Sequence, residues 1–310
     1  MPGYDDIKKM WLQHELILRK LKNYGDIYFV DATNGSDGNR GTDPSSPFKS
    51  TEHAIDVVTD WNNDVVIHKG YENLTAGITI DKNKMSLLGW GLFGSNPAFP
   101  EVGCIDRSTA EDAPVIGIEA EFVEIAGLAF NGVWNVAGVA GQAPLECVDS
   151  LANKTWIHDC FFPDWTRASM TAGIKINGCH YVVVEDCNFQ SVYGNMDAGI
   201  YIMSAVGAPA YHKVKRCNFM GGSAAMANGI HDIFGSQFFE YEDLSFSYVT
   251  NALRFAGAKS LWGTVKGLTG TMTGANICVG GAACDTIANA YTQYKVTLAD
   301  CWGNDGPLVA

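Results

Sequence analysis

Several side chains that could act as acids or bases hold the same place in a recurring strand motif. The motif is Gly-Ile-x-Ile or a close variant, and x is its outward position. That position holds, in order, Thr79, Glu146, Lys175, Tyr201, His231, Arg254 and Cys278. If the copies are stacked strands, neighbours in this row lie about 4.8 Å apart.

A β-elimination on a polysaccharide needs a base and a group that neutralises the substrate carboxylate, and Lys, Tyr, His and Arg side chains can fill these roles. The catalytic candidates in the row are therefore Lys175, Tyr201, His231 and Arg254. The other interpretation is a mixed-charge exposed strand held by ion pairs between turns.

A second set of candidates is aromatic and suits sugar binding. Counted from a recurring Phe, four aromatic residues fall at nearly equivalent places in the following loops: Trp134, Trp165, Tyr193 and Tyr248. Aromatic rings in such loops can contact sugar rings. The alternative is that they fold down and cover the wall of the domain.

Glycoside hydrolysis would need two carboxylates about 5 to 9.5 Å apart. The candidates that follow strands are Asp149, Asp164, Asp197 and Asp232. Asp232 takes an inward position that Ile176 and Ile202 hold in other copies of the motif. A buried carboxylate needs partners, so we expect the strand to end early and turn Asp232 outward.

No cofactor or metal site is expected. The nine cysteines include no Cys-x-x-Cys pair, and reduced, buried thiols are the simplest interpretation. The spacing leaves open whether Cys278 and Cys284 form a disulfide. One calcium alternative remains, at the polar cluster Asp31, Asn34, Asp37 and Asn39, which also suits a loop rich in Asx-turns.

The elements that must position these residues are short strands in a long repeat. A second motif, apolar-x-apolar-x-x-Cys-x-Phe, recurs at intervals of 24 to 33 residues. Its central residues are Ile125, Ile157, Val184, Val214, Tyr241, Val265 and Leu298. Gly-Ile-x-Ile gives a parallel series: Ile78, Val115, Leu145, Ile174, Ile200, Ile230, Leu253 and Ile277. The pattern predicts an all-β parallel solenoid of about eight turns.

Identical inward side chains should touch between turns of such a solenoid. We expect one internal stack of rings, formed by Phe130, Phe162, Phe189, Phe219 and Phe246. A second stack should contain Cys160, Cys187 and Cys217, with Leu128 and Leu244 at the equivalent points. Tight corners need positive φ, and pairs of Gly and Asn would supply it: Asn131-Gly132, Asn177-Gly178, Gly221-Gly222 and Asn228-Gly229.

The chain divides into an N-terminal helical segment, residues 1–25, and a solenoid, residues 26–310. Apolar residues spaced by three and four predict a helix from Asp5 to Tyr24 that must bury one face. It could join three copies in a coiled coil, dock on a virion, or lie along its own solenoid. A second helix over 51–61, N-capped by Ser50, would cap the solenoid with the face Ala54, Ile55, Val58 and Trp61.

The segment before this helix resembles the entry segment of the pectin lyase-like superfamily of parallel β-helices. The matching residues are Tyr28-Phe29-Val30, Asn34-Gly35-Ser36-Asp37, Gly41-Thr42, Pro47-Phe48 and Ala54-Ile55. With the repeat, the resemblance covers about residues 26–302 and implies a right-handed, single-stranded parallel β-helix. The superfamily contains lyases, hydrolases, epimerases and phage tailspikes, so fold alone does not select an activity. Within the repeat, the chain lacks the adjacent-Asp and Gly-His-Gly motifs of polygalacturonases, which disfavours the hydrolase interpretation.

Composition limits the classes of partner that the protein can bind. The 21 basic and 34 acidic residues give a net charge of −13, which disfavours nucleic acid. No apolar run is long enough for a membrane span, and the first residues predict no secretory signal peptide.

The resemblance and the missing signal peptide favour a phage or virus structural protein, such as a tailspike, fibre or capsid-surface spike. It would be a homotrimer on the virion surface that contacts other virion proteins through the N-terminal helix and attaches to a host-surface glycan. We expect no catalysis. The alternatives are an extracellular polysaccharide lyase or glycoside hydrolase, and an architectural decoration protein without glycan binding.

Overall fold

The computed structural model describes residues 25–90, 103–107, 114–132, 143–164, 171–192, 196–203, 210–233, 236–255, 262–272, 277–279, 282–283, 295–299, 302–303 and 306–307. The predicted helix over 5–24, the aromatic residues Trp134, Trp165 and Tyr193, and Cys284 lie outside these ranges. Among the described residues, no helix is long and apolar enough to span a membrane.

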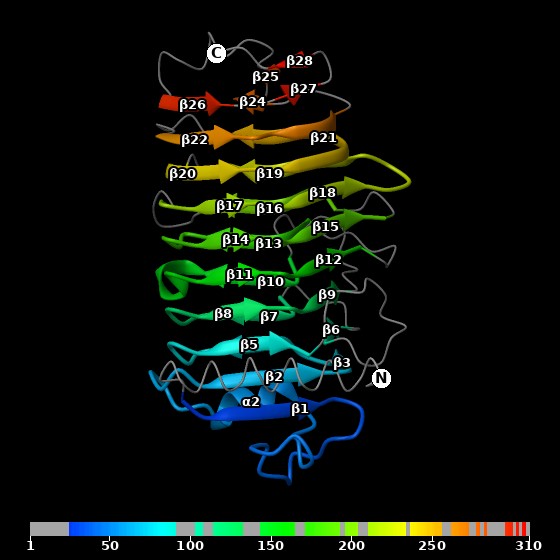
Figure 1. Ribbon diagram of the computed structural model, residues 1–310, viewed down its shortest axis with the longest axis vertical. Helices are drawn as coiled ribbons and strands as arrows, with labels where there is room; N and C mark the ends of the chain where they lie inside the picture. The colour runs from blue at the N-terminus through cyan, green and yellow to red at the C-terminus, as the bar shows by residue number, and fades with distance from the viewer. Residues whose placement is uncertain are drawn as a thin grey trace, which may run out of the picture.

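The chain forms a rod in which successive turns stack along the long axis (Figure 1). Each full turn contributes one strand to each of three faces, and neighbouring turns pair in parallel. The first face is a ten-stranded sheet, made of β1 (Ile27–Asp31), β2 (Val65–Lys69), β5 (Ser86–Gly89), β8 (Glu124–Ala126), β11 (Trp156–His158), β14 (Val183–Glu185), β17 (Lys213–Lys215), β20 (Gln237–Glu242), β22 (Trp262–Lys266) and β26 (Lys295–Ala299).

The other two faces form one 16-stranded sheet, because the long strand β21 (Ser245–Phe255) runs through both. The second face contains β3 (Tyr71–Leu74), β6 (Cys104–Arg107), β9 (Ala129–Gly132), β12 (Phe161–Pro163), β15 (Asn188–Ser191), β18 (Asn218–Gly221), the first part of β21, and β23 (Thr269–Met272). The third contains β4 (Ile78–Ile80), β7 (Ile116–Ile118), β10 (Leu145–Val148), β13 (Ala172–Asn177), β16 (Ala198–Met203), β19 (Met226–Asp232), the second part of β21, and β24 (Ile277–Val279).

The remaining elements are short. A 3₁₀ turn covers Asp149–Ala152 after β10. Strand β25 (Ala282–Ala283) pairs antiparallel with β24, and β27 (Trp302–Gly303) pairs antiparallel with β28 (Gly306–Pro307).

The predicted phenylalanine stack is confirmed. Ring centroids are 5.4 Å apart between Phe130 and Phe162, and 5.0 Å between Phe162 and Phe189. The stack continues at 5.0 Å to Phe219 and 5.2 Å to Phe246, with planes within 15° of parallel throughout. The continuous apolar interior required by the repeat therefore exists.

The glycine of Gly-Ile-x-Ile is required by this stack. A Cβ added at Gly199 would lie 2.4 Å from Cδ1 of Phe219, and one at Gly229 would lie 2.4 Å from Cε1 of Phe246. The two motifs of the repeat are thus coupled, because each ring occupies the space that a side chain at the preceding glycine of Gly-Ile-x-Ile would fill.

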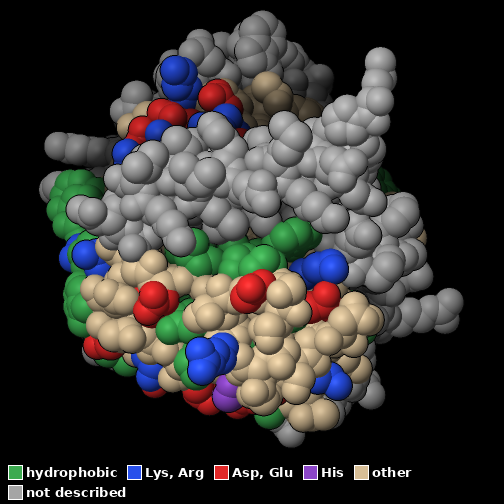
Figure 2. Space-filling view, turned by 60° about the horizontal axis from the view of Figure 1, so that its bottom comes forward, with side chains coloured by type: hydrophobic (Ala, Val, Ile, Leu, Met, Phe, Trp, Pro, Cys, Tyr) green, Lys and Arg blue, Asp and Glu red, His purple; other side chains and the backbone are tan. Residues whose placement is uncertain are grey.

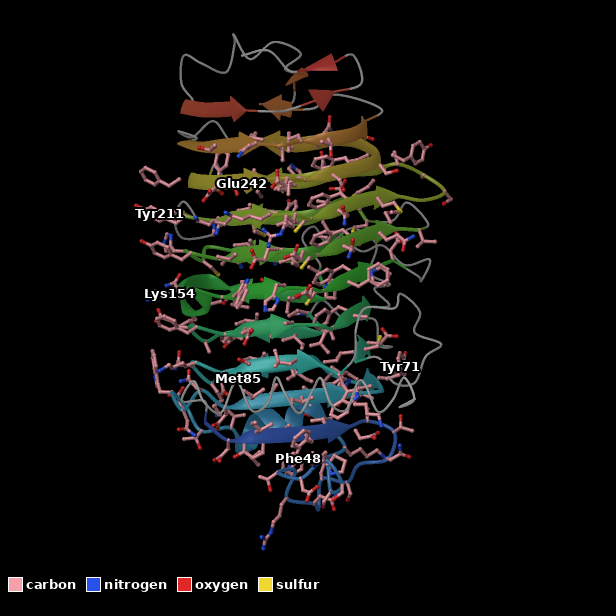
Figure 3. The ribbon with its side chains drawn as sticks, in the orientation of Figure 1. Phe48, Tyr71, Met85, Lys154, Tyr211 and Glu242 are labelled. Carbon is pink, nitrogen blue, oxygen red and sulfur yellow. The ribbon has the colours of Figure 1, made fainter. Side chains whose placement is uncertain are left out.

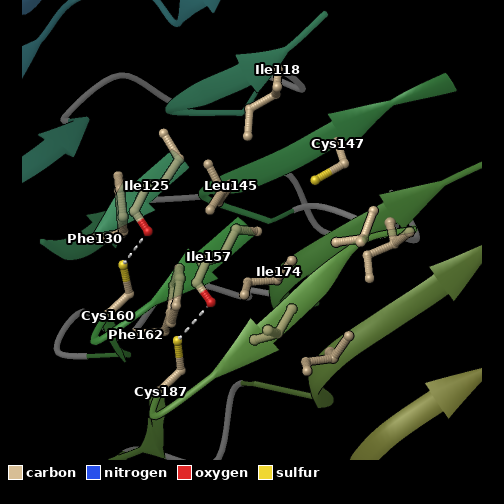
Figure 4. Close-up of a cluster of buried hydrophobic side chains, with 14 of the residues drawn as sticks. Ile118, Ile125, Phe130, Leu145, Cys147, Ile157, Cys160, Phe162, Ile174 and Cys187 are labelled. Atoms are coloured by element: carbon tan, nitrogen blue, oxygen red, sulfur yellow. Dashed lines mark hydrogen bonds between the residues drawn. The ribbon is translucent and has the colours of Figure 1, made fainter. Parts of the chain in front are cut away.

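The cysteine stack is also present. Cys160, Cys187 and Cys217 are buried and free, and the Cys160 and Cys187 thiols donate to the carbonyls of Ile125 and Ile157 (Figure 4). Burial, followed by contact with the other two thiols, raises the pKa of Cys187 well above its usual range. These cysteines act as apolar filling of the interior.

The corners differ from the prediction. Gly178 has the expected positive φ of 74°, but Asn131-Gly132 and Asn228-Gly229 lie within strands, and Gly221 ends β18. Non-glycine residues take positive φ instead, and their amides bridge the turns: Tyr181 N donates to Ala210 O at 3.0 Å. Hydrogen bonds between turns therefore hold backbone conformations that cost free energy in isolation.

The solenoid begins with a polar loop and helix α2 (Thr51–Val57), whose buried Ala54 and Ile55 join the interior core. Ser50 is the N-cap and accepts from His53 N, as predicted. The helix ends four residues earlier than predicted, because Val58 is extended, and Trp61 is 52% exposed at positive φ instead of packing with the core. Figure 2 views this end, where a band of hydrophobic side chains crosses a largely polar surface.

The buried side chain of His212 should make the stability of the fold sensitive to acid. Lys213 pairs with Val183 of the previous turn. His212, which precedes Lys213, therefore holds the same position as Val182, which precedes Val183. Its two ring nitrogens have no hydrogen-bond partner among the described residues, and burial, with a smaller contribution from His180, lowers its pKa to about 3. Because the folded pKa lies below the unfolded value of about 6.5, stability is lost as pH falls from about 6.5 toward 4.

Substitution His212→Val should reduce this loss by roughly 2–3 kcal/mol, since the apolar side chain fits the ladder and has no proton to bind. The measurement is urea unfolding of both proteins at pH 7 and pH 4.5. An equal loss of stability in both would contradict the assignment. His68 and His231, each with a pKa lowered to about 4 by burial, keep their own share of the pH dependence in the variant.

Candidate functional site

The predicted outward row exists on the third face. Glu146 pairs with Lys175, Lys175 with Tyr201, Tyr201 with His231, and His231 with Arg254, on the adjacent strands β10, β13, β16, β19 and β21. Gly117 holds the position between Thr79 and Glu146. The central residue of that turn is Ile116, which pairs with Ile78 and Leu145; the assignment to Val115 is wrong by one residue.

The first two members of the row form an ion pair. Lys175 Nζ lies 2.9 Å from Glu146 Oε1, and both side chains are largely buried. Asn177 Nδ2 also donates to Glu146 Oε1 at 3.3 Å. This part of the row matches the cross-turn ion pairing that the sequence allowed, so Lys175 is engaged by its neighbours.

Among the described residues, the next three members form no such ion pair. Tyr201 and His231 are only 8% and 7% exposed, and their rings meet edge to face with centroids 5.1 Å apart. In the part of the chain that the structure describes, neither ring nitrogen of His231 nor Nε of Arg254 has a hydrogen-bond partner. Unpartnered buried donors and acceptors cost about 1–3 kcal/mol each, so this cluster holds free energy that a ligand could recover.

Electrostatics keep His231 neutral. Burial, followed by the nearby positive charge of Arg254, lowers the His231 pKa to about 4. Burial also raises the Tyr201 pKa, with a further rise from Asp197 that Arg254 opposes. At neutral pH the site therefore offers an uncharged imidazole, a phenol and a guanidinium side by side.

Asp197 joins this cluster from the turn before β16. The residue as a whole is exposed, yet the packing around its carboxyl group raises its pKa, and Arg254 opposes that rise. Asp197, one of the four aspartates that the sequence suggests for hydrolysis, is in electrostatic contact with Arg254 and Tyr201 of the row.

The other aspartates lie elsewhere. Asp232 stays in strand β19, fully buried and paired with Ile202 and Phe255, so the expectation that it turns outward is wrong. Ser236 N donates to its Oδ2 at 2.7 Å, which supplies a partner inside the solenoid. Asp164 is buried and accepts from Ser191 Oγ, and the side chain of Asp149 lies outside the described residues.

Of the aromatic candidates, only Tyr248 is described. It lies within β21 at a φ of 57° and is 44% exposed. Its ring is therefore available at the surface, while Trp134, Trp165 and Tyr193 remain sequence-based predictions.

Another aromatic surface, which the sequence did not predict, lies at the corner between the third and first faces. The rings of Tyr181 and Tyr211 stack at 4.7 Å, and those of Tyr211 and Phe238 at 5.0 Å, each residue with positive φ. Lys154 lies at the same corner, over the ring of Phe122 (Figure 3). Because the rings cover each other's faces, this corner stack presents ring edges, and we assign it to stabilisation of the corner.

The polar entry loop has internal partners for its carboxylates. Asp31 accepts from the amides of Thr33 and Asn34 and pairs with Lys69 Nζ at 3.1 Å. Asp37 accepts from the amides of Lys49 and Ser50. These contacts are those of Asx-turns and loop closure, and among the described residues no group of three or more His, Cys, Asp or Glu side chains could hold a metal ion.

No family model matches the chain, and no curated protein has a matching sequence. Solved structures do match. The pectate lyase Pel9A has a TM-score of 0.55 and 12% identity, covering 93% of this chain and 82% of its own. A rhamnogalacturonan lyase has a TM-score of 0.49 and 16% identity, covering 81% of this chain and 75% of its own.

A protein of Geobacillus virus E2, ORF18, has a TM-score of 0.46 and 13% identity, covering 98% of this chain and 65% of its own. At these identities, structural similarity defines the fold and not the activity. The parallel register and the match to Pel9A show that the chain has the right-handed parallel β-helix fold of pectin lyase-like proteins.

Proposed function

We propose that this protein binds a polysaccharide along the third face, over Lys175, Tyr201, His231 and Arg254, and that it does so as the attachment protein of a virus particle. The observation that carries the binding proposal is the pair of buried, unpartnered groups in the row, the His231 imidazole and Arg254 Nε. A wall of a folded domain seldom leaves such groups unsatisfied unless a ligand completes them.

The chemistry of these groups suits sugar hydroxyls. A neutral imidazole has one donor and one acceptor nitrogen, and a guanidinium has only donors. A hydroxyl can pair with either, and a carboxylate can pair with the guanidinium. From Glu146 to Arg254 the row spans four steps between strands, or about 19 Å, which is long enough for an extended chain to contact several turns.

The viral part of the proposal is supported by the resemblance of the entry segment to superfamily members that include phage tailspikes. It predicts that the gene lies among genes for tail or capsid proteins and that antibody to the protein labels intact particles. A gene neighbourhood of polysaccharide catabolism, with a secreted product, would instead favour the extracellular alternative.

Loss of the unpartnered groups should weaken glycan retention. We expect Arg254→Gln to lower affinity for a retained polysaccharide by about 10- to 100-fold, because a hydrogen bond from a charged group contributes about 1.5–3 kcal/mol. Affinity electrophoresis against a polysaccharide panel measures this. The matched control is Arg216→Gln on the first face, where the guanidinium already pairs with Asp186 and Glu185. Equal retention by all three proteins would exclude the row as the binding site.

One observation favours a second candidate, a polysaccharide lyase. His231 is neutral and can accept a proton, and Arg254 beside it can pair with a substrate carboxylate. In that reaction His231 would take the proton next to the carboxylate, and the glycosidic oxygen would leave as the carbon–carbon double bond forms. Unsaturated, ultraviolet-absorbing products that disappear in His231→Gln would support the lyase; polysaccharide that is retained intact supports binding alone.

A further inference from the structure

We propose that residues 5–24 form a helix that packs across the outer side of β1, β2 and β5 of the same chain. The segment and the surface fit each other in polarity, position and length. This docking is independent of the glycan site on the third face.

The first face changes character along the rod. Five outward side chains in its first three strands form an apolar patch, here called the entry patch: Ile27, Phe29, Val65, Ile67 and Leu88. In later turns the same two rows become mostly polar and charged, with Glu124, His158, Glu185, Lys215 and Glu242. A solvated sheet face needs no apolar side chains, so the entry patch marks a covered region.

The centre of the entry patch is buried. Phe29, Val65 and Ile67 are 7%, 0% and 2% exposed, although they point away from the solenoid core. Among the described residues, their cluster extends only to Ile27, Leu88 and Trp90, and helix α2 packs with the interior core instead. Outward apolar side chains with exposures as low as those of Val65 and Ile67, 0% and 2%, indicate that another segment lies over them.

The described chain begins beside this place. Gly25 N donates to Asn63 O at 3.0 Å and Asp26 N to Asp64 Oδ1 at 2.7 Å, so the chain is fixed at the corner where β1 begins. A Cβ at Gly25 would lie 2.1 Å from Asp64 Oδ1, so the approach is too close for any other residue. A connection of two residues, Gly25 and Asp26, is short enough to keep the proposed helix next to the strand that it enters.

Length and pattern agree. Strand β1 has five residues, or about 17 Å, which about 11 residues of helix span. Residues 14–24 therefore suffice to cover the entry patch, and Ile17, Leu18, Leu21 and Tyr24 supply an apolar stripe at helical spacing. Because this stripe cannot face the patch and a coiled-coil partner at once, docking competes with the trimeric coiled coil that the sequence also allows.

Hydrogen exchange of the full chain tests the docking. In Ile67→Glu, amides of residues 5–24 should exchange about tenfold faster or more, because a charge in the entry patch displaces the helix while core strands stay protected. The matched control, Lys215→Glu, changes charge on the same row among charged neighbours and should leave exchange at 5–24 unchanged. Unchanged protection of 5–24 in Ile67→Glu would overturn the proposal.

If Ile67→Glu does not fold, a chemical cross-link tests whether residues 5–24 dock on the entry patch of the same chain. With Leu21→Cys and Leu88→Cys in one chain, a short bis-maleimide should join the two positions within that chain, since the six described native cysteines are buried. Leu21→Cys alone is the control and should give no such product. Products that form only between differently tagged copies, or none at all, would overturn the proposal in favour of an intermolecular helix or a free one.

Discussion

Replacing Phe189 by alanine should lower the free energy of unfolding by about 3–5 kcal/mol. The ring is 1% exposed and lies in the middle of the internal stack, 5.0 Å from the rings of both Phe162 and Phe219. Its removal loses apolar burial and two ring contacts, and it leaves a cavity between turns that the backbone ladder holds at a fixed spacing.

Urea unfolding followed by circular dichroism measures the change. The matched control is Phe122→Ala, which removes the exposed corner ring that lies under Lys154. It should lower the free energy of unfolding by about 1 kcal/mol or less. Similar losses in the two variants would mean that the internal stack does not carry the stability of the solenoid.

This stack could be predicted residue by residue because a parallel solenoid imposes a simple rule. Once two motifs share a register, every equivalent residue contacts its counterpart one turn away. The series from Ile125 to Leu298 on the first face follows that rule without exception in the observed pairing. Tyr241 fits the series although it is a tyrosine among aliphatic residues, since its position, not its type, is what the repeat specifies.

The rule fails where local chemistry permits two registers. Val115 and Ile116 are both apolar and buried, so the sequence could not decide which one is central. The outward position that follows is Gly117, which carries no side chain to mark the row. Asp232 shows the opposite error: its type suggested a surface position, but the amide of Ser236 provides a partner that sequence spacing does not reveal.

The corners could not be predicted from residue type. Glycine and asparagine take positive φ at low cost, which made them the natural candidates. In the structure, Asp159, Asp186, Arg216 and Asp243 take positive φ at one corner. Hydrogen bonds to the next turn, such as Arg216 N to Glu242 O at 2.9 Å, outweigh the local preference, and such bonds exist only after stacking.

The residues of the candidate site could be predicted from the sequence, but their hydrogen bonding, ion pairing and pKa values could not. The row itself follows from register, so Lys175, Tyr201, His231 and Arg254 were found together. That Lys175 is paired while His231 and Arg254 carry unpartnered nitrogens depends on what surrounds each side chain in three dimensions. Burial sets the His231 pKa, and no spacing rule supplies burial at an outward position.

Because the two repeat motifs are coupled, replacing the glycine of Gly-Ile-x-Ile should have a large effect on stability. Gly199→Ala should destabilise the protein by about 1–3 kcal/mol or more, because the new Cβ would lie 2.4 Å and 2.5 Å from two carbons of the Phe219 ring. That ring is held between Phe189 and Phe246 and cannot move away without disturbing both contacts.

A double-mutant cycle isolates this contact. Phe219→Leu alone should destabilise by opening space in the stack, but in the Gly199→Ala background part of that space receives the new methyl group. The double variant should therefore be more stable than the sum of the single effects predicts, by about 1 kcal/mol or more. Chemical unfolding of the four proteins gives the coupling free energy.

The control for backbone effects is Gly117→Ala, an outward glycine in strand β7. Its added Cβ would have its nearest contact at 3.5 Å, with Pro114 Cγ, so alanine fits and should change stability by less than about 1 kcal/mol. If Gly199→Ala and Gly117→Ala cost the same, the loss reflects the removal of glycine as such. If Gly199→Ala costs much more and Phe219→Leu offsets it, the glycine of Gly-Ile-x-Ile is there because the phenylalanine stack occupies the space of its side chain.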